Sequence, residues 1–424
     1  MLAPVGKLPA QGRAADEVLA ELESFKVDDR DFRNGRVFGL VFHVDEELER
    51  VLTAAHDAYL WHNALNPDAF PSLRRMTTDI IDIATSLLGG DAIDDEPSGF
   101  LSSGGTESIL MAVKAAKVRG ARERDVHAPN VVLPMSAHAA FDKAFEYFGI
   151  EPRRIDVRDD FRADVDAMAD AIDDATVLVV GSAPQYPQGV IDPIPELAAL
   201  AMERDISCHV DACMGGFVLP FLERGGREIP PWDFRVPGVT SISADLHKYG
   251  YVPKGISVIM HRSRELRRNQ TFAFDGWLGG FYGSSGILGT KPGGPIAAGW
   301  AAFQYLGEDG YRRLCEAAFA ARERFVVGVR AIPGLAIVGE PEVTIAAITA
   351  SGSAPDVDVF ALNDELSRRG WHLDRQGPPD SLHATCVPVH LGIMDEFLAD
   401  LRTSVAVVTG MHTDDRSTTY AAVE

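Results

Sequence analysis

A glycine pair followed by a threonine stands where a helix is expected to begin, in the segment SSGGTES at residues 102–108. Glycine lets the backbone approach a ligand closely, and the free N–H groups at a helix start attract an anion such as a phosphate group. Gly104, Gly105 and Thr106 are therefore candidates for holding a phosphate. The same pattern also fits an ordinary helix start that is capped by Ser103 or Thr106.

An aspartate ends a later apolar run, in the segment HVDACMGG at residues 209–216. Open α/β sheets bind ligands at the carboxyl ends of their strands, where Asp211 is expected to lie. A buried carboxylate is costly unless it meets a cation, and the protonated pyridine nitrogen of pyridoxal 5′-phosphate (PLP) is such a cation. Asp211 is therefore a candidate partner for that ring, although an aspartate that caps the following loop would show the same pattern.

Two lysines lie six residues apart in the segment SADLHKYGYVPK at residues 243–254, in a chain that has only eight lysines. Lys248 follows His247 directly after a predicted strand. A lysine that forms an imine must be desolvated and unpaired, which lowers its pKa, whereas an isolated lysine is more often a solvated surface residue. Lys248 stands 37 residues after Asp211. A phosphate loop, an aspartate and a lysine in this order are the arrangement of PLP enzymes of fold type I.

Short apolar runs that alternate with helical stretches are expected to position these groups. The strands are expected at 131–134, 176–180, 206–210, 239–243 and 257–261. The helices between and around them are expected at 106–122, 138–148, 163–173 and 194–204. Strands that are buried on both faces have continuous apolar sequences, and their alternation with helices predicts a mostly parallel sheet.

The pattern of expected helices and strands divides the chain into four parts. Helices are expected at 13–29, 45–61 and 72–89, and a long helix at 298–330 is followed by strands and helices up to about residue 406. We therefore expect an N-terminal helical segment, a large PLP-binding domain, a small C-terminal domain and a polar tail, whose respective boundaries are 1–60, 61–300, 301–410 and 411–424.

The composition excludes several classes of partner. A formal net charge of −22 repels nucleic acid and anionic membranes. No apolar run reaches the roughly 18 residues that a membrane helix requires, and residues 1–13 lack the apolar block of a secretory signal. The four cysteines show no metal-ligand spacing and are interpreted as reduced thiols. We expect a cytoplasmic protein that binds no metal and does not insert into a membrane.

Five motifs occur in the same order as in the sphingosine-1-phosphate lyases, and the resemblance extends over about residues 35–400. They are SSGGTES (102–108), AHAAFDKAFEYFGI (137–150), YPQGVIDPI (186–194), HVDACMGGF (209–217) and SADLHKYGYVPKG (243–255). The chain thus resembles this family, which lies in the group II decarboxylase branch of fold-type I PLP enzymes. The resemblance implies an α/β fold, with a large domain of mostly parallel sheet flanked by helices and a smaller C-terminal α+β domain.

The resemblance also implies which residues bind PLP and act on the substrate. Lys248 would form the imine and move protons, Asp211 would pair with the pyridine nitrogen, and His138 would stack on the ring. The full set implied for the cofactor is Gly104, Gly105, Thr106, His138, Asp211, His247, Lys248 and Thr290. His247 would contact the phosphate or the imine region, and Tyr186 would face the substrate, although simple packing explains Tyr186 as well.

In the resembled lyases two subunits share each active site, so the resemblance implies a homodimer. The segment GTKPG at 289–293 is similar to a loop that reaches the partner's cofactor phosphate, with Thr290 and Lys291 where the family usually has serine and arginine. The segment HNALNP at 62–67, which contains Asn63, is similar to another loop that lines the partner's entrance. Both replacements at 290 and 291 keep a hydrogen-bond donor.

The substrate-phosphate pocket departs from the family pattern. The family uses a tyrosine, a histidine and a lysine, and the corresponding residues here are Phe42, Asn66 and Lys254. Phe42 lacks a hydroxyl donor, and Asn66 keeps an amide donor but loses a positive charge that histidine can carry. A charge-assisted contact contributes about 1.5–3 kcal/mol, so the loss of two donors puts the substrate's phosphate in doubt.

Three main functions remain open at this point, together with aminotransfer as a weaker enzyme alternative. The first is a carbon–carbon lyase that cleaves a β-hydroxy amine, phosphorylated and long-chain or a related small molecule, into an aldehyde and an amine. The second is an L-amino-acid decarboxylase, which uses the same cofactor groups. Aminotransfer is weaker, because no arginine can be placed for a substrate carboxylate. The third is a non-catalytic scaffold, against which the retention of His138, Asp211 and Lys248 argues.

Overall fold

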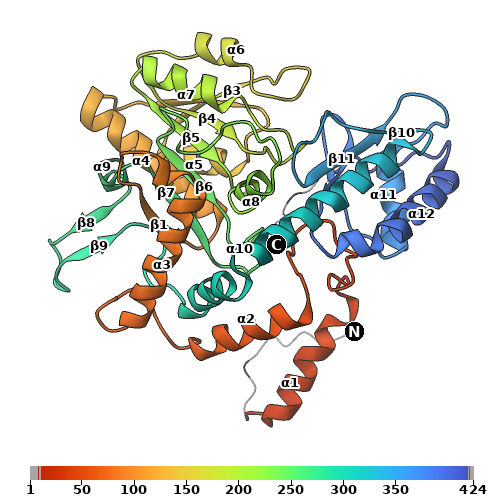
Figure 1. Ribbon diagram of the computed structural model, residues 1–424, viewed down its shortest axis with the longest axis horizontal. Helices are drawn as coiled ribbons and strands as arrows, with labels where there is room; N and C mark the ends of the chain where they lie inside the picture. The colour runs from red at the N-terminus through yellow and green to blue at the C-terminus, as the bar shows by residue number, and fades with distance from the viewer. Residues whose placement is uncertain (1–7, 9–10, 419, 421–424) are drawn as a thin grey trace.

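The computed structural model describes residue 8, residues 11–418 and residue 420, and it shows a large and a small domain joined by a long helix (Figure 1). The N-terminal part consists of α1 (Ala15–Ser24), η1 (Phe25–Asp28), α2 (Glu46–Ala58), α3 (Pro71–Leu87) and η2 (Gly90–Ala92). These elements confirm the helices expected at 13–29, 45–61 and 72–89. The carboxylate of Asp45 caps α2 by accepting a hydrogen bond from the backbone of Leu48 at 2.8 Å.

The large domain is built on a seven-stranded sheet of order β1-β7-β6-β5-β4-β2-β3. Its strands are β1 (Ser98–Ser102), β2 (Asn130–Pro134), β3 (Glu151–Ile155), β4 (Thr176–Ser182), β5 (Ser207–Asp211), β6 (Ser241–Ala244) and β7 (Ser257–His261). All neighbouring pairs are parallel except those of β7, which runs antiparallel to both β1 and β6. The mostly parallel sheet confirms the fold class expected from the sequence.

Alternate residues of the central strands enter two different cores, which explains their continuous apolar sequences. Val131 and Leu133 of β2 pack against α4 and α5, whereas Val132 between them packs into the core on the opposite face. The helices that cover this domain are α4 (Gly105–Arg124), α5 (Ala140–Phe148), α6 (Val165–Asp170), α7 (Ile194–Glu203), α8 (Leu219–Arg224) and α9 (Arg264–Arg268).

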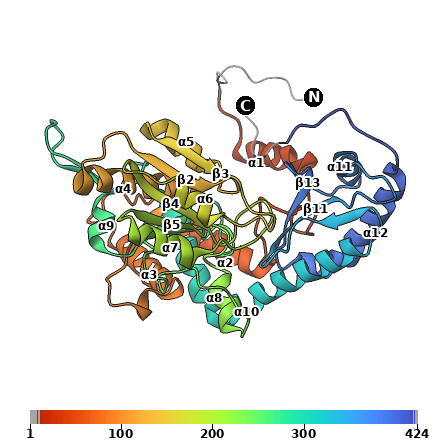
Figure 2. The same cartoon turned by 90° about the horizontal axis from the view of Figure 1, so that it is seen from above.

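Helix α10 (Gly293–Arg330) connects the two domains, as the two views of the chain show (Figures 1 and 2). Phe303 in its first half belongs to the core of the large domain, whereas Phe325 near its end is buried in the core of the small domain. The helix is broken at Gly307, whose φ of 57° lies in the left-handed region that favours glycine. The sequence predicted this helix from residue 298, five residues after its actual start.

The small domain is an antiparallel sheet covered by two helices. Its strand order is β10-β11-β13-β12, formed by β10 (Leu335–Ile337), β11 (Ile345–Ala350), β12 (Asp374–Gln376) and β13 (Ser381–Thr385). The helices are α11 (Val359–Arg368) and α12 (His390–Val408). Phe38 from the N-terminal part is also buried in this core, stacked on His390 with ring centroids 4.1 Å apart.

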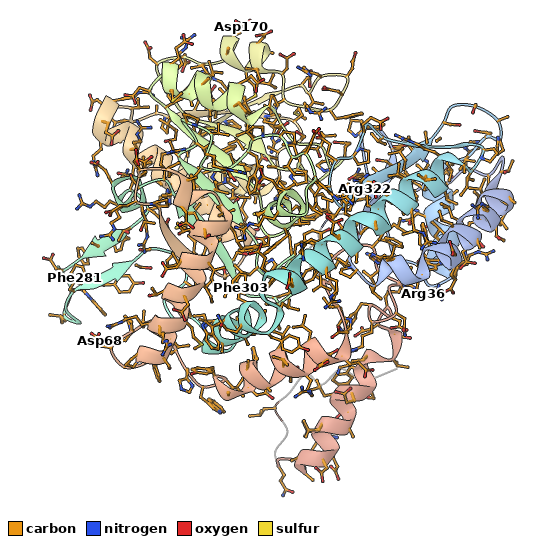
Figure 3. All side chains as sticks on the ribbon, in the orientation of Figure 1. Arg36, Asp68, Asp170, Phe281, Phe303 and Arg322 are labelled. Carbon is orange, nitrogen blue, oxygen red and sulfur yellow. The ribbon has the colours of Figure 1, made fainter. Side chains whose placement is uncertain are left out.

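A two-stranded hairpin, β8 (Phe272–Phe274) and β9 (Tyr282–Ser284), projects from the large domain. Figure 3 shows Phe281 at the outer end of this hairpin, away from the rest of the chain. Within the described residues, none of the helices combines the length and apolar character that membrane crossing requires. No group of acidic, histidine or cysteine side chains in the same part of the chain is arranged to hold a metal ion.

Candidate active site

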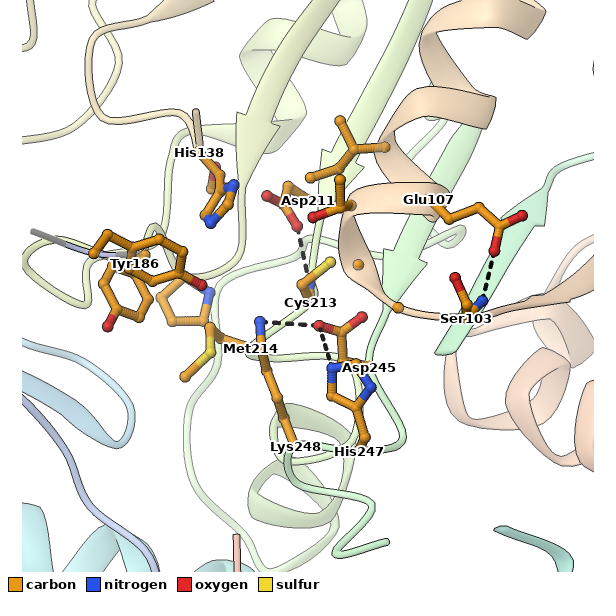
Figure 4. A pocket seen from close by; sticks show the side chains of 17 residues that line it. Ser103, Glu107, His138, Tyr186, Asp211, Cys213, Met214, Asp245, His247 and Lys248 are labelled. Carbon is orange, nitrogen blue, oxygen red and sulfur yellow. Dashed lines mark hydrogen bonds and ion pairs between the residues drawn. The ribbon is translucent and has the colours of Figure 1, made fainter. Parts of the chain in front are cut away.

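A cavity of about 300 Å³ lies at the carboxyl ends of β4, β5 and β6, beside the start of α4 (Figure 4). It contains every residue that the sequence predicted to touch the cofactor except Thr290, and it also contains Tyr186. Its lining residues are Ser103, Gly104, Gly105, Thr106, Glu107, Ile109, His138, Ser182, Pro184, Tyr186, Asp211, Cys213, Met214, Asp245, His247, Lys248 and Tyr420.

The start of α4 forms one wall of the cavity, and the lack of space beside Gly105 explains why a glycine stands there. A Cβ atom on Gly105 would lie 2.7 Å from an oxygen of Asp245 and 2.8 Å from the sulfur of Cys213, so no side chain fits there. Glu107 fixes this wall, because its carboxylate accepts hydrogen bonds from the backbone of Ser103 and of Ile287, both at 2.6 Å. The first residues of this 20-residue helix line the cavity, so the free N–H groups of its first turn are available to an anion there.

Asp211 ends β5 and is held by two hydrogen bonds. Its Oδ1 accepts one bond from the backbone of Cys213 and one from the hydroxyl of Ser243, both at 3.1 Å. Ser243 is the partner of Asp211 in the register of β5 and β6, and its hydroxyl also lies 3.2 Å from Nε2 of His209. Burial lowers the pKa of His209 to about 4, so this ring is neutral and acts as a hydrogen-bonding support for the carboxylate side chain.

Lys248 follows β6 and forms an ion pair with the carboxylate of Asp245, which was not among the residues predicted for the site. Its Nζ lies 2.9 Å from Oδ2 of Asp245, while the hydroxyl of Ser257 donates to Oδ1 at 2.6 Å. Nε2 of His247 lies 3.5 Å from the same carboxylate, and its Nδ1 is buried with no hydrogen-bond partner in the described part of the chain. The polar groups of Asp245, His247 and Lys248, from one four-residue stretch of the chain, thus form one wall of the cavity.

The ion pair corrects the expectation of an unpaired lysine with a lowered pKa. Burial by itself would lower the pKa of Lys248, but the nearby carboxylate of Asp245 raises it above its ordinary value. Burial would in turn raise the pKa of Asp245, but the ammonium of Lys248 holds it well below its usual range. In this arrangement Lys248 is an ammonium, and it becomes a nucleophile when its proton passes to another group.

His138 and Tyr186 form the side of the cavity opposite Lys248 (Figure 4). Nδ1 of His138 accepts a hydrogen bond from the backbone of Ala140 at 3.0 Å, and burial lowers the pKa of the ring, which keeps it neutral. The ring of Tyr186 stacks on His383 with centroids 3.9 Å apart, and its hydroxyl points to Asp374 at 3.4 Å. Burial raises the pKa of Tyr186, which keeps its phenol neutral. The stacking on His383 fits a packing role for this ring.

The four residues predicted to bind the substrate lie outside this cavity. Phe42 and Lys254 line a separate apolar hollow of about 310 Å³, in which Nζ of Lys254 lies 4.9 Å from the ring centroid of Phe42 and 3.1 Å from the backbone oxygen of His247. Asn66 stands in an exposed turn, where its side chain accepts from the backbone of Asp68 at 2.9 Å. The substrate residues predicted from the sequence therefore do not converge within one chain, because Asn63 is also elsewhere.

The two segments that resemble partner-subunit loops lie side by side. Asn63 forms an isolated β-bridge with Pro292, and its side-chain oxygen accepts a hydrogen bond from the backbone of Lys291 at 3.3 Å. Thr290 belongs to the same stretch and does not line the cavity of its own chain. Nζ of Lys291 lies 4.2 Å from the ring centroid of Phe100. The predicted loop residues thus form a single surface unit rather than part of this cavity.

The cavity residues fit PLP chemically. The helix start at Gly105 lets a phosphate group approach the backbone closely, which suits the phosphate of PLP. The carboxylate of Asp211 suits the protonated ring nitrogen, and the amine of Lys248 suits the aldehyde. The chain matches the model of the pyridoxal-dependent decarboxylase conserved domain over residues 60–348. The fold and the cavity therefore define a fold-type I enzyme whose cofactor is pyridoxal 5′-phosphate.

Comparison with individual proteins narrows this class. Sphingosine-1-phosphate lyase 1 of Rattus norvegicus is 41% identical over 407 residues, which are 95% of this chain and 70% of the relative. The solved sphingosine-1-phosphate lyase of Burkholderia pseudomallei is 39% identical, with a TM-score of 0.90 over 95% of this chain and 92% of that one. The chain belongs to the sphingosine-1-phosphate lyase family and is a PLP-dependent lyase.

A more distant likeness concerns the fold alone. Glutamate decarboxylase of Lactobacillus brevis superposes with a TM-score of 0.85 over 97% of each chain, at 21% identity. The fold is thus shared between carbon–carbon lyases and decarboxylases, and the residues of the site have to distinguish the reactions.

Proposed function

We propose that this enzyme cleaves the Cα–Cβ bond of a long-chain β-hydroxy amine, phosphorylated or closely related, and releases an aldehyde and an amine. The observation that carries the proposal is the meeting of Lys248, Asp211 and the start of α4 in one cavity of a chain from the sphingosine-1-phosphate lyase family. Family membership supports the reaction type. The substrate given in the names of these relatives, sphingosine 1-phosphate, supports a place in sphingolipid metabolism.

The proposed cofactor contacts follow from the walls of the cavity. Gly104, Gly105 and Thr106 would bind the phosphate, and Asp211 would keep the pyridine nitrogen protonated. His138 would lie against one face of the ring, and Lys248 would bind the aldehyde carbon. When bound, PLP supplies a sink for the electron pair of the broken bond.

Proton transfers are proposed for the chain's own groups. The β-hydroxyl of the substrate must lose its proton as the Cα–Cβ bond breaks and the aldehyde leaves, and Cα must then gain a proton to give the amine. Lys248 and His247 line the cavity and would take and return these protons. Tyr186 would line the substrate side and exclude water, since its hydroxyl is directed to Asp374.

The reaction is tested by product analysis with matched substrates. Purified enzyme would be incubated with phosphorylated and unphosphorylated long-chain β-hydroxy amines and with acidic and aromatic L-amino acids, followed by mass spectrometry. We expect a long-chain aldehyde together with the amine. Release of CO₂ from an amino acid, with no aldehyde from any β-hydroxy amine, would support decarboxylation and a role in amino-acid metabolism instead.

Lys254 is the proposed contact for a substrate phosphate, and its titration gives a pH test. The surrounding protein lowers the pKa of Lys254 to about 8, mainly through loss of solvation and also through the nearby Lys248. An ammonium that loses its proton above pH 8 binds an anion less well, so KM for a phosphorylated substrate should rise as pH increases through this value. Loss of one charge-assisted contact corresponds to about 10–100-fold in affinity.

The variant Lys254→Arg provides the control, because arginine keeps its charge at every pH used. We expect its KM to stay flat between pH 7 and 9, whereas Lys254→Ala should show the high KM at all pH values. An unphosphorylated substrate should be insensitive to both changes. Equal pH profiles for the native enzyme and Lys254→Arg would refute the assignment.

We further propose a homodimer in which each cavity is completed by the other subunit. The hairpin and the segment after it expose a row of apolar side chains, among them Phe281 at 75%, and the neighbouring Trp61 is 91% exposed. Exposed apolar surface of this extent is typical of an interaction site. Thr290, Lys291 and Asn63 lie in this same region, so a second copy docked here would bring them toward a cavity that is not their own.

Complementation tests the shared site. Lys248→Ala and Lys291→Ala would each be inactive as homodimers, but a mixed dimer would contain one cavity with both native residues. After subunit exchange at equal concentrations we expect about a quarter of the native activity, because half of the dimers are mixed and each has one intact site. Two variants that stay inactive after confirmed exchange would contradict a shared site.

We also propose that the enzyme works in the cytoplasm. All four cysteines are buried free thiols, which suits a reducing compartment. A net charge of −22 opposes binding to anionic lipid surfaces. Fractionation of the native host should place the protein with the cytosolic fraction, and recovery in the membrane pellet at high salt would contradict this location.

A further inference from the structure

The C-terminal segment brings Tyr420 to the wall of the active-site cavity, which the sequence did not indicate. The ring of Tyr420 meets His138 edge-on, with centroids 5.1 Å apart and planes at 82°. It meets Tyr186 in the same way, at 5.2 Å and 80°. Edge-to-face contacts of this kind are favourable between aromatic rings. Tyr420 thus bridges the two aromatic residues that form the side of the cavity opposite Lys248.

Tyr420 stands at the mouth of the cavity. Its side chain borders the same space as Lys248, yet the residue is 51% exposed, whereas the side chain of Lys248 is 17% exposed. One part of Tyr420 therefore faces the cavity and another part faces solvent. A molecule that enters from this side passes the tyrosine before it reaches the lysine.

Ion pairs to the small domain hold the segment in this position. Arg416 pairs with Asp358, the residue that caps α11, at 2.6 Å and also with Asp380. Arg375 of β12 donates to both the backbone oxygen and the carboxylate of Asp415, each at 3.1 Å. The chain is thus fixed four and five residues before Tyr420, on the small-domain side of the cavity.

The contacts that hold the segment before Tyr420 are weak enough for this segment to move away from the cavity. Residues 411–418 form no helix or strand, and the groups that anchor them are partly exposed ion pairs, which contribute little individually. Segments with few buried apolar contacts open at a much lower free energy than the core does. The cover is here defined as residues 410–418 together with Tyr420.

We propose that this cover controls entry to the active-site cavity, with Tyr420 as the closing side chain and Arg416 as its main anchor. The cofactor and the amine substrate are taken from the proposed function, whereas the cover itself follows from the contacts of the chain. Opening would release Tyr420 from His138 and Tyr186, admit the ligand, and allow the tyrosine to return over it.

A buried thiol in the cavity provides a test that needs no cofactor. Cys213 lines the cavity, whereas the other three cysteines are buried elsewhere. Cofactor-free protein would be treated with iodoacetamide, and labelling of each cysteine would be followed by mass spectrometry. We expect Tyr420→Ala and Arg416→Ala to label Cys213 about tenfold faster than the native protein, since the rate follows the population of the open state.

Matched variants separate opening from general loosening of the fold. Tyr420→Phe keeps the ring and should behave like the native protein. Tyr147→Ala removes an exposed tyrosine of α5, and Arg324→Ala removes a surface ion pair with Asp395, so both should leave Cys213 unchanged. Labelling of Cys208, Cys315 and Cys386 should be equally slow in all variants. Native-like labelling of Cys213 in Tyr420→Ala, with the fold intact, would overturn the proposal.

Uptake of PLP gives a second readout. The rate at which absorbance of the bound cofactor develops after mixing should rise in Tyr420→Ala and Arg416→Ala by the same factor as labelling of Cys213. An unchanged uptake rate in both variants would contradict control of entry by the cover. Failure of the native protein to bind PLP through Lys248 would instead contradict the proposed function, while the thiol result would still decide the cover.

Discussion

Replacing Lys248 by alanine is expected to lower kcat by at least about 10³-fold, because the side chain is proposed both to bind the cofactor aldehyde and to carry protons. The change also leaves the buried carboxylate of Asp245 without its ammonium partner, which stands 2.9 Å away. An uncompensated buried charge costs about 3–5 kcal/mol, so a lower melting temperature should accompany the loss of activity. Steady-state kinetics and thermal unfolding would measure the two effects.

The variant Lys248→Arg separates chemistry from stability. Arginine keeps a cation near Asp245 but does not condense with an aldehyde under physiological conditions, because its pKa is too high. We expect it to be as inactive as Lys248→Ala and more stable. Lys143→Ala, which removes a lysine of α5 outside the cavity, should retain native activity. Turnover close to the native value in Lys248→Arg would be incompatible with imine formation at this residue.

Replacing Asp211 by asparagine is expected to reduce kcat by about 10²–10³-fold, the scale of losing one preorganised electrostatic partner in an active site. The two hydrogen bonds that position Asp211 both go to Oδ1, and an amide oxygen can accept them from Cys213 and Ser243 in the same way. The substitution should therefore leave the side chain in place and remove only the negative charge that is proposed to keep the pyridine nitrogen protonated.

The measurement combines kcat with the absorbance spectrum of the bound cofactor, which reports its protonation. Asp205→Asn is the matched control, because Asp205 precedes the same strand at its far end and pairs with Arg119 on the surface. The control should retain native kcat and spectrum. If Asp211→Asn also kept both, the carboxylate would not be the partner of the ring nitrogen.

Much of the large domain could be predicted because burial on both faces leaves a clear trace in the sequence. The apolar runs that became β2 and β4 are continuous, so their existence was evident without knowledge of the sheet order. Strand β3, with the sequence EPRRI, was missed because it lies at the edge of the sheet and is half-exposed, so charged side chains are tolerated there. The short hairpin strands β8 and β9 carry too few residues to show a period.

The order of the chemical groups along the chain was sufficient to find the cavity. Gly105, Asp211 and Lys248 come from three different segments, and the parallel sheet brings their strand ends to one edge. Asp245 could have been noticed, because a carboxylate three residues before a lysine often pairs with it. No local pattern could have indicated Tyr420, because its place depends on how the chain after α12 returns across the small domain.

The substrate residues were the least predictable part. Lys254 and Phe42 lie in a hollow separate from the cavity, Asn63 pairs with the stretch that contains Pro292, and Asn66 stands in an exposed turn. A site that is completed by a second chain cannot be assembled from contacts within one chain. Residues of a shared site are indicated in the sequence only by the resemblance of their segments to loops of the family. The complementation experiment tests whether Lys291 of one subunit and Lys248 of the other act in the same cavity.

The proposed reaction depends on a covalent bond between PLP and the amine of Lys248. Reduction of the PLP-loaded enzyme with borohydride, followed by proteolysis and mass spectrometry, tests it most directly, because it identifies which of the eight lysines carries the cofactor. We predict a single pyridoxyl adduct on the peptide that contains Lys248, and none in Lys248→Arg. An adduct on another lysine, or a loaded enzyme that gives no adduct at all, would contradict the account.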